Sequence, residues 1–227
     1  MARFSFRWRR LLLGLVSAAI LLPLAAILVF RVLPPPATPL MLIRLLQGHG
    51  WDRSWVAQDR ISSNLAAAVI ASEDNRFCAQ WFGFDIAALR EQIDNWSEGE
   101  RPRGASTITM QVAKNLFLWP GRDPLRKVIE AWLTPQIALL WPKQRVLEVY
   151  LNIVEFGPGL YGAEAAAQHF FGKPAARLSV QEAALMAAVL PNPLAWSVRP
   201  PTPYIRSRAA MIAQHIGQIR PLLACAW

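Results

Sequence analysis

Two adjacent acids, Glu73 and Asp74, are the residues best suited to proton transfer, and they end the apolar run AAAVIASEDNRF at residues 66–77. A helix that reaches solvent at this point would simply expose both carboxylates. A half-buried carboxylate would instead have a raised pKa and could act as a general base. From this stretch alone exposure is the simpler interpretation, because structural carboxylates are common.

A second stretch contains the residue types of a phosphate site. In GASTIT, residues 104–109, Gly104 frees the backbone, and Ser106 and Thr107 carry hydroxyl groups that can cap a following helix. The free amides at such a helix start attract phosphate oxygens. On its own, the stretch fits an ordinary helix cap at least as well.

Basic residues follow this cap at short spacings, namely Lys114, Arg122, Arg126 and Lys127. Glu130 comes three residues after Lys127 and four after Arg126, so these three side chains share one helix face. That face could be a solvated row of ion pairs. A diphosphate, however, requires several cations together with backbone amides, and this region supplies both.

Other motifs argue against several enzyme classes. GPGLYG, residues 157–162, has the glycine spacing of a dinucleotide site, but no parallel-sheet pattern surrounds it, which favours a turn before a helix. The chain lacks Ser-x-x-Lys and Lys-Thr-Gly, the motifs of penicillin-type acyl transfer, and it lacks a P-loop. The scattered histidines and the distant Cys78 and Cys225 argue against zinc. Whether the two cysteines pair stays open.

The candidate residues fall on segments with helical periodicity. Apolar residues at helical spacing, often after a capping residue such as Asp85, predict a mainly α-helical domain at residues 60–227. The predicted helical segments are 62–77, 85–96, 106–118, 123–141, 162–172, 179–190 and 203–220. Residues 142–156 are ambiguous, because they become β-branched toward their end.

The N-terminus predicts a membrane anchor. Residues 1–10 carry four arginines and no acid, and twenty uncharged residues follow. At about 1.5 Å per residue such a helix spans the roughly 30 Å hydrocarbon layer. We expect a cytoplasmic tail at 1–10 and an uncleaved anchor at 11–32, with the rest of the chain outside the cytoplasm. A cleaved signal peptide is the main alternative.

Residues 33–59 connect the anchor to the domain. Three consecutive prolines, Pro34 to Pro36, favour an extended spacer. The apolar residues 40–51, which include Arg44, could form a core helix or a helix dipping into the outer leaflet. The formal charge of +9 on a chain that is 54% hydrophobic suggests an anionic partner: phosphates, nucleic acid or a membrane surface.

Five sequence blocks together resemble one family, in order: EDNRF…GFD, GASTITMQVAKNLFL, RKVIEAWL, VLEVYLNIVEFG…YGAEAAAQHFFGK and LSVQEAALMAAVLPNP. They are similar to the motifs of peptidoglycan glycosyltransferases, over about residues 60–210. The resemblance implies an all-α, lysozyme-like fold. Without transpeptidase motifs, it also implies the stand-alone, membrane-anchored monofunctional type.

The resemblance also implies an activity. Members polymerise lipid II, a disaccharide-pentapeptide on undecaprenyl diphosphate, into β-1,4-linked glycan strands with inversion at the donor anomeric carbon. The implied partners are lipid II, the growing lipid-linked chain and the membrane, together with cell-wall or division proteins, and nucleic acid has no role. A lysozyme-like glycan-cleaving enzyme and an inactive membrane scaffold are the alternatives.

The family motifs assign roles to individual residues. Glu73 matches the general base, and Glu130 matches a second essential carboxylate that organises the diphosphate region. No tightly bound cofactor is implied, although Glu130 could act through Mg²⁺ or Mn²⁺. The residues expected around the donor phosphates are Ser106, Thr107, Gln111, Lys114, Arg122 and Lys127. The residues expected to shape the motifs are Asp74, Arg76, Phe77, Asp85, Gly104, Arg126 and Asn152.

The first motif departs from the family pattern at FCAQWFGFD, residues 77–85. Gln80 stands where members commonly have histidine, and the stretch is one residue longer, with Trp81 or Phe82 as the extra residue. The amide of Gln80 can both donate and accept, so a structural hydrogen bond could persist. We therefore expect an active enzyme whose extra aromatic residue is displaced outward, toward lipid or solvent.

Overall fold

The computed structural model describes residues 2–97, 105–121 and 123–227. Two of the predicted site residues, Gly104 and Arg122, lie outside the described residues.

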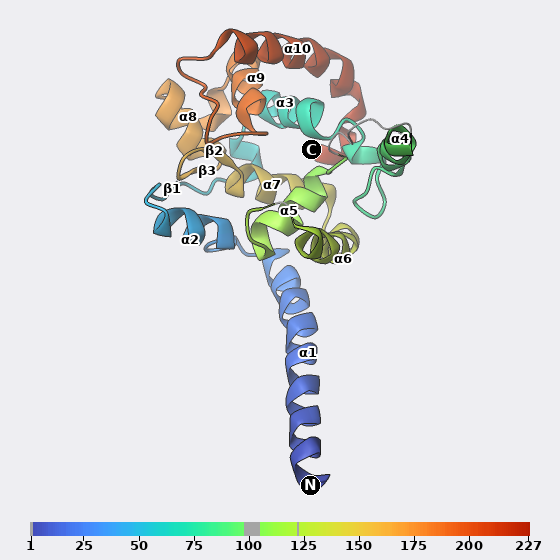
Figure 1. Cartoon of the computed structure of the whole chain (residues 1–227). Helices are drawn as coiled ribbons and strands as arrows, with labels where there is room; N and C mark the ends of the chain where they lie inside the picture. The colour runs from blue at the N-terminus through green and yellow to red at the C-terminus, as the bar shows by residue number, and fades with distance from the viewer. Residues whose placement is uncertain (1, 98–104, 122) are drawn as a thin grey trace.

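Helices form most of the described chain, which confirms the predicted fold class (Figure 1). The α-helices are α1 (Ala2–Phe30), α2 (Pro39–Leu46), α3 (Ser63–Glu73), α4 (Ile86–Ser97), α5 (Ile108–Phe117), α6 (Pro124–Leu140), α7 (Lys143–Ile153), α8 (Ala163–Phe171), α9 (Val180–Val189) and α10 (Pro203–Ile219). The 3-10 helices are η1 (Gln58–Arg60), η2 (Phe77–Ala79), η3 (Ala175–Arg177), η4 (Arg220–Leu222) and η5 (Ala224–Ala226).

A small sheet accompanies the helices in the described chain. Its strands are β1 (Asp52–Arg53), β2 (Glu155–Gly157) and β3 (Leu160–Tyr161), in the order β1-β3-β2. β3 pairs in parallel with β1 and antiparallel with β2. The ambiguous segment is thus helix α7 followed by β2. The turn between β2 and β3 requires Gly159, because a Cβ there would lie 2.1 Å from the His49 carbonyl oxygen.

Helix α3 is the centre of the core. Its residues from Leu65 to Ala71 are all buried, as expected of a helix that is apolar on every side. α9 and α10 pack against it (Figure 1). Ser62 caps its start by accepting from the amide of Asn64, and the helix ends at Glu73. The core therefore fixes the position at which Glu73 leaves the helix.

Helices α5, α6 and α7 pack together on the other side of the domain. Thr107 caps α5 by accepting from the amide of Met110, and Asp123 caps α6 by accepting from the amide of Arg126. The packing of α5 against α6 brings Lys114 close to Arg126 and Lys127.

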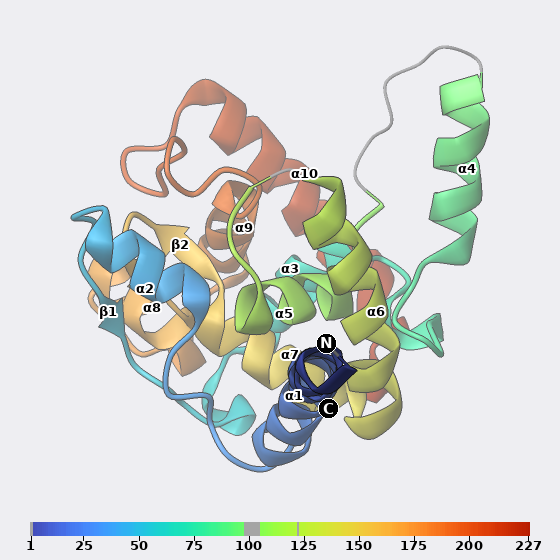
Figure 2. The same cartoon turned by 60° about the horizontal axis from the view of Figure 1, so that its bottom comes forward.

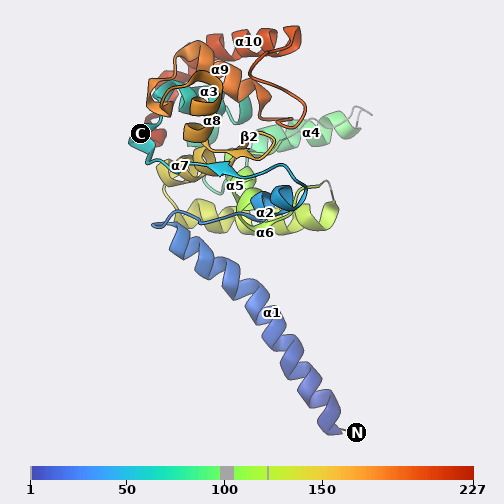
Figure 3. The ribbon, with the colours of Figure 1, turned by 90° about the vertical axis from the view of Figure 1, so that its left-hand side faces the viewer.

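Helix α1 projects from the domain (Figures 1 and 3). It includes the arginine-rich start, and its part from Trp8 to Phe30 is long and apolar enough to cross a membrane. The following α2 buries Met41 and exposes Leu42, Leu45 and Leu46, so it has both a core face and an apolar outer face.

Cys78 and Cys225 form a disulfide. The pairing that the sequence left open therefore joins η2, just after the end of α3, to η5 at the C-terminus.

Candidate active site

The carboxylate of Glu73 is largely buried, with 12% of the side chain exposed. Gln111 on α5 donates from Nε2 to Glu73 Oε2 at 3.0 Å. The hydroxyl of Tyr150, on α7, donates to Gln111 Oε1 at 3.0 Å and thereby fixes which end of the amide faces Glu73. Solvent exposure, the simpler interpretation of the acid pair, is wrong for Glu73.

Burial raises the pKa of Glu73, and the hydrogen bond from Gln111 and the charges of Arg208 and Lys114 oppose this rise. Arg208, on α10, has Nη2 3.9 Å from Glu73 Oε1. Its Nε donates to the Ala188 carbonyl at the end of α9. A buried carboxylate with a raised pKa is suited to take up a proton, and the nearby cation favours the charged form that accepts it. No local spacing pattern in the sequence pointed to Arg208.

Asp74 joins the end of α3 to the start of α5. Its side chain is buried, with Oδ2 accepting from the amide of Ile108 at 2.9 Å and Oδ1 accepting from Gln80 Nε2. Burial raises the pKa of Asp74 to about 6, against these hydrogen bonds and the attraction of Lys143. The role expected for Asp74, shaping the first motif, agrees with these contacts.

The neighbouring motif residues make contacts that hold the fold. Phe77 is fully buried, with Lys143 Nζ 4.5 Å from the centre of its ring. Arg76 lies 3.6 Å from Asp85, which also accepts from the amide of Ala88 and so caps α4 as predicted.

The altered first motif keeps one hydrogen bond and exposes its aromatic residues. Gln80 is buried and donates to Asp74. Trp81 and Phe82 are 86% and 57% exposed, so both are displaced outward. The added length of this loop therefore leaves the contacts of Asp74 intact.

Glu130 organises the cations of α6. It is 2% exposed, accepts from Arg126 through Oε2, and accepts from Lys127 Nζ through Oε1 at 2.6 Å. Lys127 also donates to the hydroxyl of Ser106 at 2.9 Å. The predicted shared face of Arg126, Lys127 and Glu130 is confirmed. Of the two candidate caps, Thr107 caps α5, whereas Ser106 contacts Lys127.

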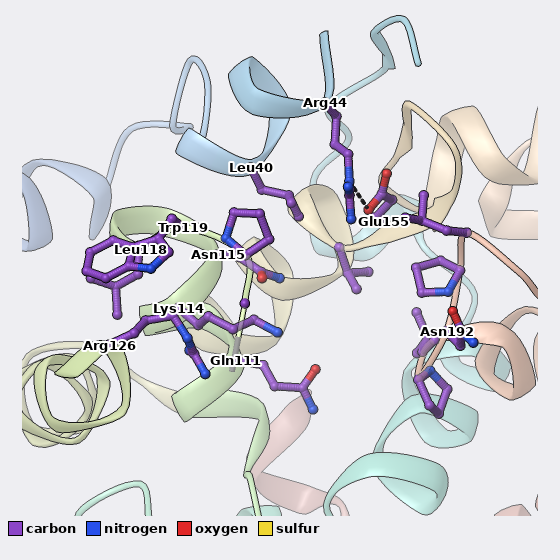
Figure 4. A pocket seen from close by; sticks show the side chains of 17 residues that line it. Leu40, Arg44, Gln111, Lys114, Asn115, Leu118, Trp119, Arg126, Glu155 and Asn192 are labelled. Carbon is purple, nitrogen blue, oxygen red and sulfur yellow. Dashed lines mark hydrogen bonds and ion pairs between the residues drawn. The ribbon is translucent and has the colours of Figure 1, made fainter. Parts of the chain in front are cut away.

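A pocket of about 470 Å³ opens beside these groups (Figure 4). Gln111, Lys114 and Asn115 line it from α5, Arg126 lines it from α6, and Arg44 from α2 lies across from them. Burial lowers the pKa of Lys114, which Glu130 opposes. The pocket can therefore hold a polyanion between cations.

A second pocket has a volume of about 390 Å³. Glu73, Arg76, Asp85 and Ser106 line it. Since Gln111 lines the first pocket and Glu73 the second, the hydrogen-bonded pair stands between two spaces. A proton acceptor at this border could serve a group in one space that attacks a molecule in the other.

The described residues do not form a side-chain site for a metal ion. Both carboxylate oxygens of Glu130 already accept from cationic side chains, and no group of three histidine, cysteine or acidic residues gathers in the described chain. Glu130 thus has cationic side chains as partners on both of its carboxylate oxygens.

Asn152 lies outside both pockets. On α7, its Nδ2 donates to the carbonyls of Val56 and Glu148, and its Oδ1 accepts from the amide of Val56. The residue holds the segment after β1 against α7, which agrees with a role in shaping the fold.

Comparison with known proteins gives a family match. The profile of the family described as Transglycosylase matches residues 41–216. The chain is 55% identical to a biosynthetic peptidoglycan transglycosylase of Rhodospirillum centenum, over 92% of this chain and 93% of the relative. It is 46% identical to one of Caulobacter vibrioides, over 97% and 96%, and 53% identical to one of Pseudomonas fluorescens, over 85% and 82%.

Proposed function

The chain belongs to the transglycosylase family, and from this premise we propose how its site works. The enzyme is a peptidoglycan glycosyltransferase that polymerises lipid II into glycan strands for the cell wall. One observation carries the assignment of the site: the buried Glu73 accepts a hydrogen bond from Gln111, and Gln111 lines the cation-lined pocket.

Glu73 is the general base in this proposal. Its carboxylate accepts the proton of the acceptor 4-hydroxyl as that oxygen attacks the donor anomeric carbon. The bond from this carbon to the diphosphate breaks, and the electron pair leaves on the diphosphate. Attack from the opposite face converts the α-linked donor into a β-1,4 bond. The raised pKa of Glu73 supports the role, because a base works best when its pKa lies close to the working pH.

The leaving diphosphate is stabilised by fixed cations. Lys114 and Arg126 line the first pocket, Lys127 follows Arg126 on α6, and Glu130 holds Arg126 and Lys127 in position. Such preorganised charge stabilises the transition state, because it needs no rearrangement as negative charge develops. Arg122 and Thr107 complete the expected set, Arg122 as a further cation implied by the family motif and Thr107 as the cap that starts α5.

A divalent cation enters the proposal only with the substrate. Since Glu130 is already paired with two cations, Mg²⁺ or Mn²⁺ would bind the diphosphate of lipid II rather than a protein site.

Polymerisation of purified lipid II by two glutamine variants tests the site. Glu73→Gln preserves shape and hydrogen bonding but cannot accept the proton, so the rate should fall about 100-fold or more. Glu130→Gln removes the charge that holds Arg126 and Lys127, so it should lower the rate and also weaken donor binding. Glu91→Gln, at an exposed residue of α4, is the matched control. A near-normal rate for Glu73→Gln would refute the assignment of the base.

The location is the bacterial inner membrane, with the N-terminus cytoplasmic and the catalytic domain periplasmic. The apolar helix and the arginines before it support this orientation. The substrate and the growing lipid-linked chain then lie in the same membrane, where other cell-wall or division proteins are natural neighbours. Alkaline phosphatase fused after the proline spacer should be active. Activity of a cytoplasmic reporter alone would contradict this topology.

A further inference from the structure

The end of α1 is held by side chains of the catalytic domain. The last carbonyls of a helix lack partners within the helix, and a cation there is favourable. Arg145, on α7, donates to the Phe30 carbonyl from Nε and Nη2 at 2.9 and 2.8 Å, and from Nη2 to the Leu33 carbonyl at 2.7 Å. Trp141 donates from Nε1 to the Ile27 carbonyl at 2.7 Å. The domain therefore caps its own anchor.

These contacts are buried. Ile27 is fully buried, Trp141 nearly so, and the side chain of Arg145 is only 10% exposed. Figure 2 looks nearly along α1, and α6 packs against this helix. Earlier residues of α1, such as Leu21 and Leu22, are exposed. The contact is thus confined to the end of the helix that leaves the membrane.

The proline spacer is also attached to α7, through Arg53. Arg53 donates to the Pro36 carbonyl at 2.9 Å and to the Asn152 carbonyl, near the end of α7, at 3.2 Å. The ring of Trp55 lies 5.4 Å from the guanidinium of Arg53 and 5.4 Å from that of Arg145. The spacer therefore does not act as a loose tether, because Arg145 of α7 binds Leu33, and Arg53 of β1, itself bonded to α7, binds Pro36.

Helix α7 also reaches the active site. Arg145 lies near its start, and Tyr150, which orients Gln111 against Glu73, lies five residues further on. At about 1.5 Å per residue this distance is roughly 8 Å along one short, rigid helix. A single element thus connects the anchor to the residues that hold the base.

We infer that Trp141 and Arg145 are positioning residues that fix the height and orientation of the active site above the bilayer. A donor and a growing chain whose prenyl tails stay in the membrane present their sugars at a defined depth. A domain free to tilt on its anchor would meet them less often in the productive geometry. This inference rests on the proposed lipid II polymerase function. Tyr150, Gln111 and Glu73 make none of the anchor contacts. The chemistry itself should therefore not depend on the anchor contacts.

The test compares two substrates on the same proteoliposomes. The variant Trp141→Phe, Arg145→Met removes the donors to the anchor and keeps the apolar bulk. With lipid II embedded in the vesicles, its rate should fall about 10-fold or more, because lost orientation is costly. With a lipid II analogue carrying a short, water-soluble prenyl chain, its rate should stay within about 2-fold of wild type, since the geometry around the base is unchanged.

Matched variants separate positioning from folding. Arg177→Met removes the same charge at an exposed site and should leave both rates unchanged. Arg145→Lys keeps the charge with fewer donors, so its relative rates on the two substrates should differ less than those of the double variant. It also provides the test if the double variant does not fold. If the variant keeps the same fraction of the wild-type rate on both substrates, whether that fraction is high or low, the inference is overturned. Activity of wild type on the soluble analogue establishes the function independently, and wild type inactive on both substrates would overturn the function and this inference together.

Discussion

Replacing Asp74 by asparagine should stabilise the protein at neutral pH. Burial raises the pKa of this carboxyl from its usual 3.8 to about 6, so the charged form is disfavoured in the folded state. The stability that the protonated form contributes is fully present below about pH 4 and is lost as pH rises through about 6. At about 1.4 kcal/mol per pKa unit, the shift from 3.8 to about 6 makes this loss about 3 kcal/mol.

An asparagine side chain can keep both hydrogen bonds of Asp74. Its amide oxygen can accept from the amide of Ile108, which now binds Asp74 Oδ2. Its Nδ2 then faces Gln80, whose Oε1 is buried and has no hydrogen-bond partner among the described residues. If the amide of Gln80 turns over, this oxygen accepts from the substituted amide in place of the present bond to Asp74.

Unfolding in detergent micelles at several pH values measures the effect. The free energy of unfolding of Asp74→Asn should equal that of wild type near pH 4 and exceed it by up to about 3 kcal/mol at pH 7. The attraction of Lys143 and the repulsion of Asp85 are already included in the raised pKa. Asp59→Asn removes an exposed carboxylate and should follow wild type throughout. A variant destabilised equally at every pH would refute this reasoning.

Three further predictions concern the neighbouring residues. The polymerisation rate should rise with pH through a midpoint above the ordinary 4.5 of a glutamate, because burial raises the pKa of Glu73; a midpoint at or below 4.5 would contradict this. Replacing Cys78 and Cys225 by serine should lower the free energy of unfolding by about 3–5 kcal/mol, since the disulfide closes a loop of 147 residues; an unchanged denaturation midpoint with and without reductant would argue against it. Changing Gln80→His with deletion of Phe82 should alter stability by less than about 2 kcal/mol and leave polymerisation unchanged or faster, and a slower enzyme would be the contrary result.

Features of the site that depend on one helix could be predicted from the sequence. The apolar run from Leu65 to Ala71 predicts a helix with the two acids after the run, and the structure ends α3 at Glu73. The spacing of Arg126, Lys127 and Glu130 predicts their ion pairs, because residues three and four apart meet on a helix surface. Such contacts follow from helix geometry alone.

Contacts between distant segments could not be predicted in this way. Arg208 reaches Glu73 because α10 packs across α3, and Tyr150 orients Gln111 because α7 packs against α5. Neither partner is marked by spacing in the sequence. The same holds for the buried state of Glu73, since an acid at a helix end is exposed or enclosed according to what packs over it.

The altered first motif shows how tertiary contacts absorb an insertion. Three restraints hold its start: Phe77 in the core, the disulfide at Cys78, and the hydrogen bond from Gln80 to Asp74. The disulfide partner is itself secured, because Gln144 donates to the Trp227 carbonyl at 2.9 Å and Gln58 donates to that of Ala226. Loop length enters the closure entropy only logarithmically, so one extra residue costs little once both ends are fixed. The added length therefore projects outward as exposed aromatic surface, and the bond from Asp74 to the start of α5, on which the active site depends, is preserved.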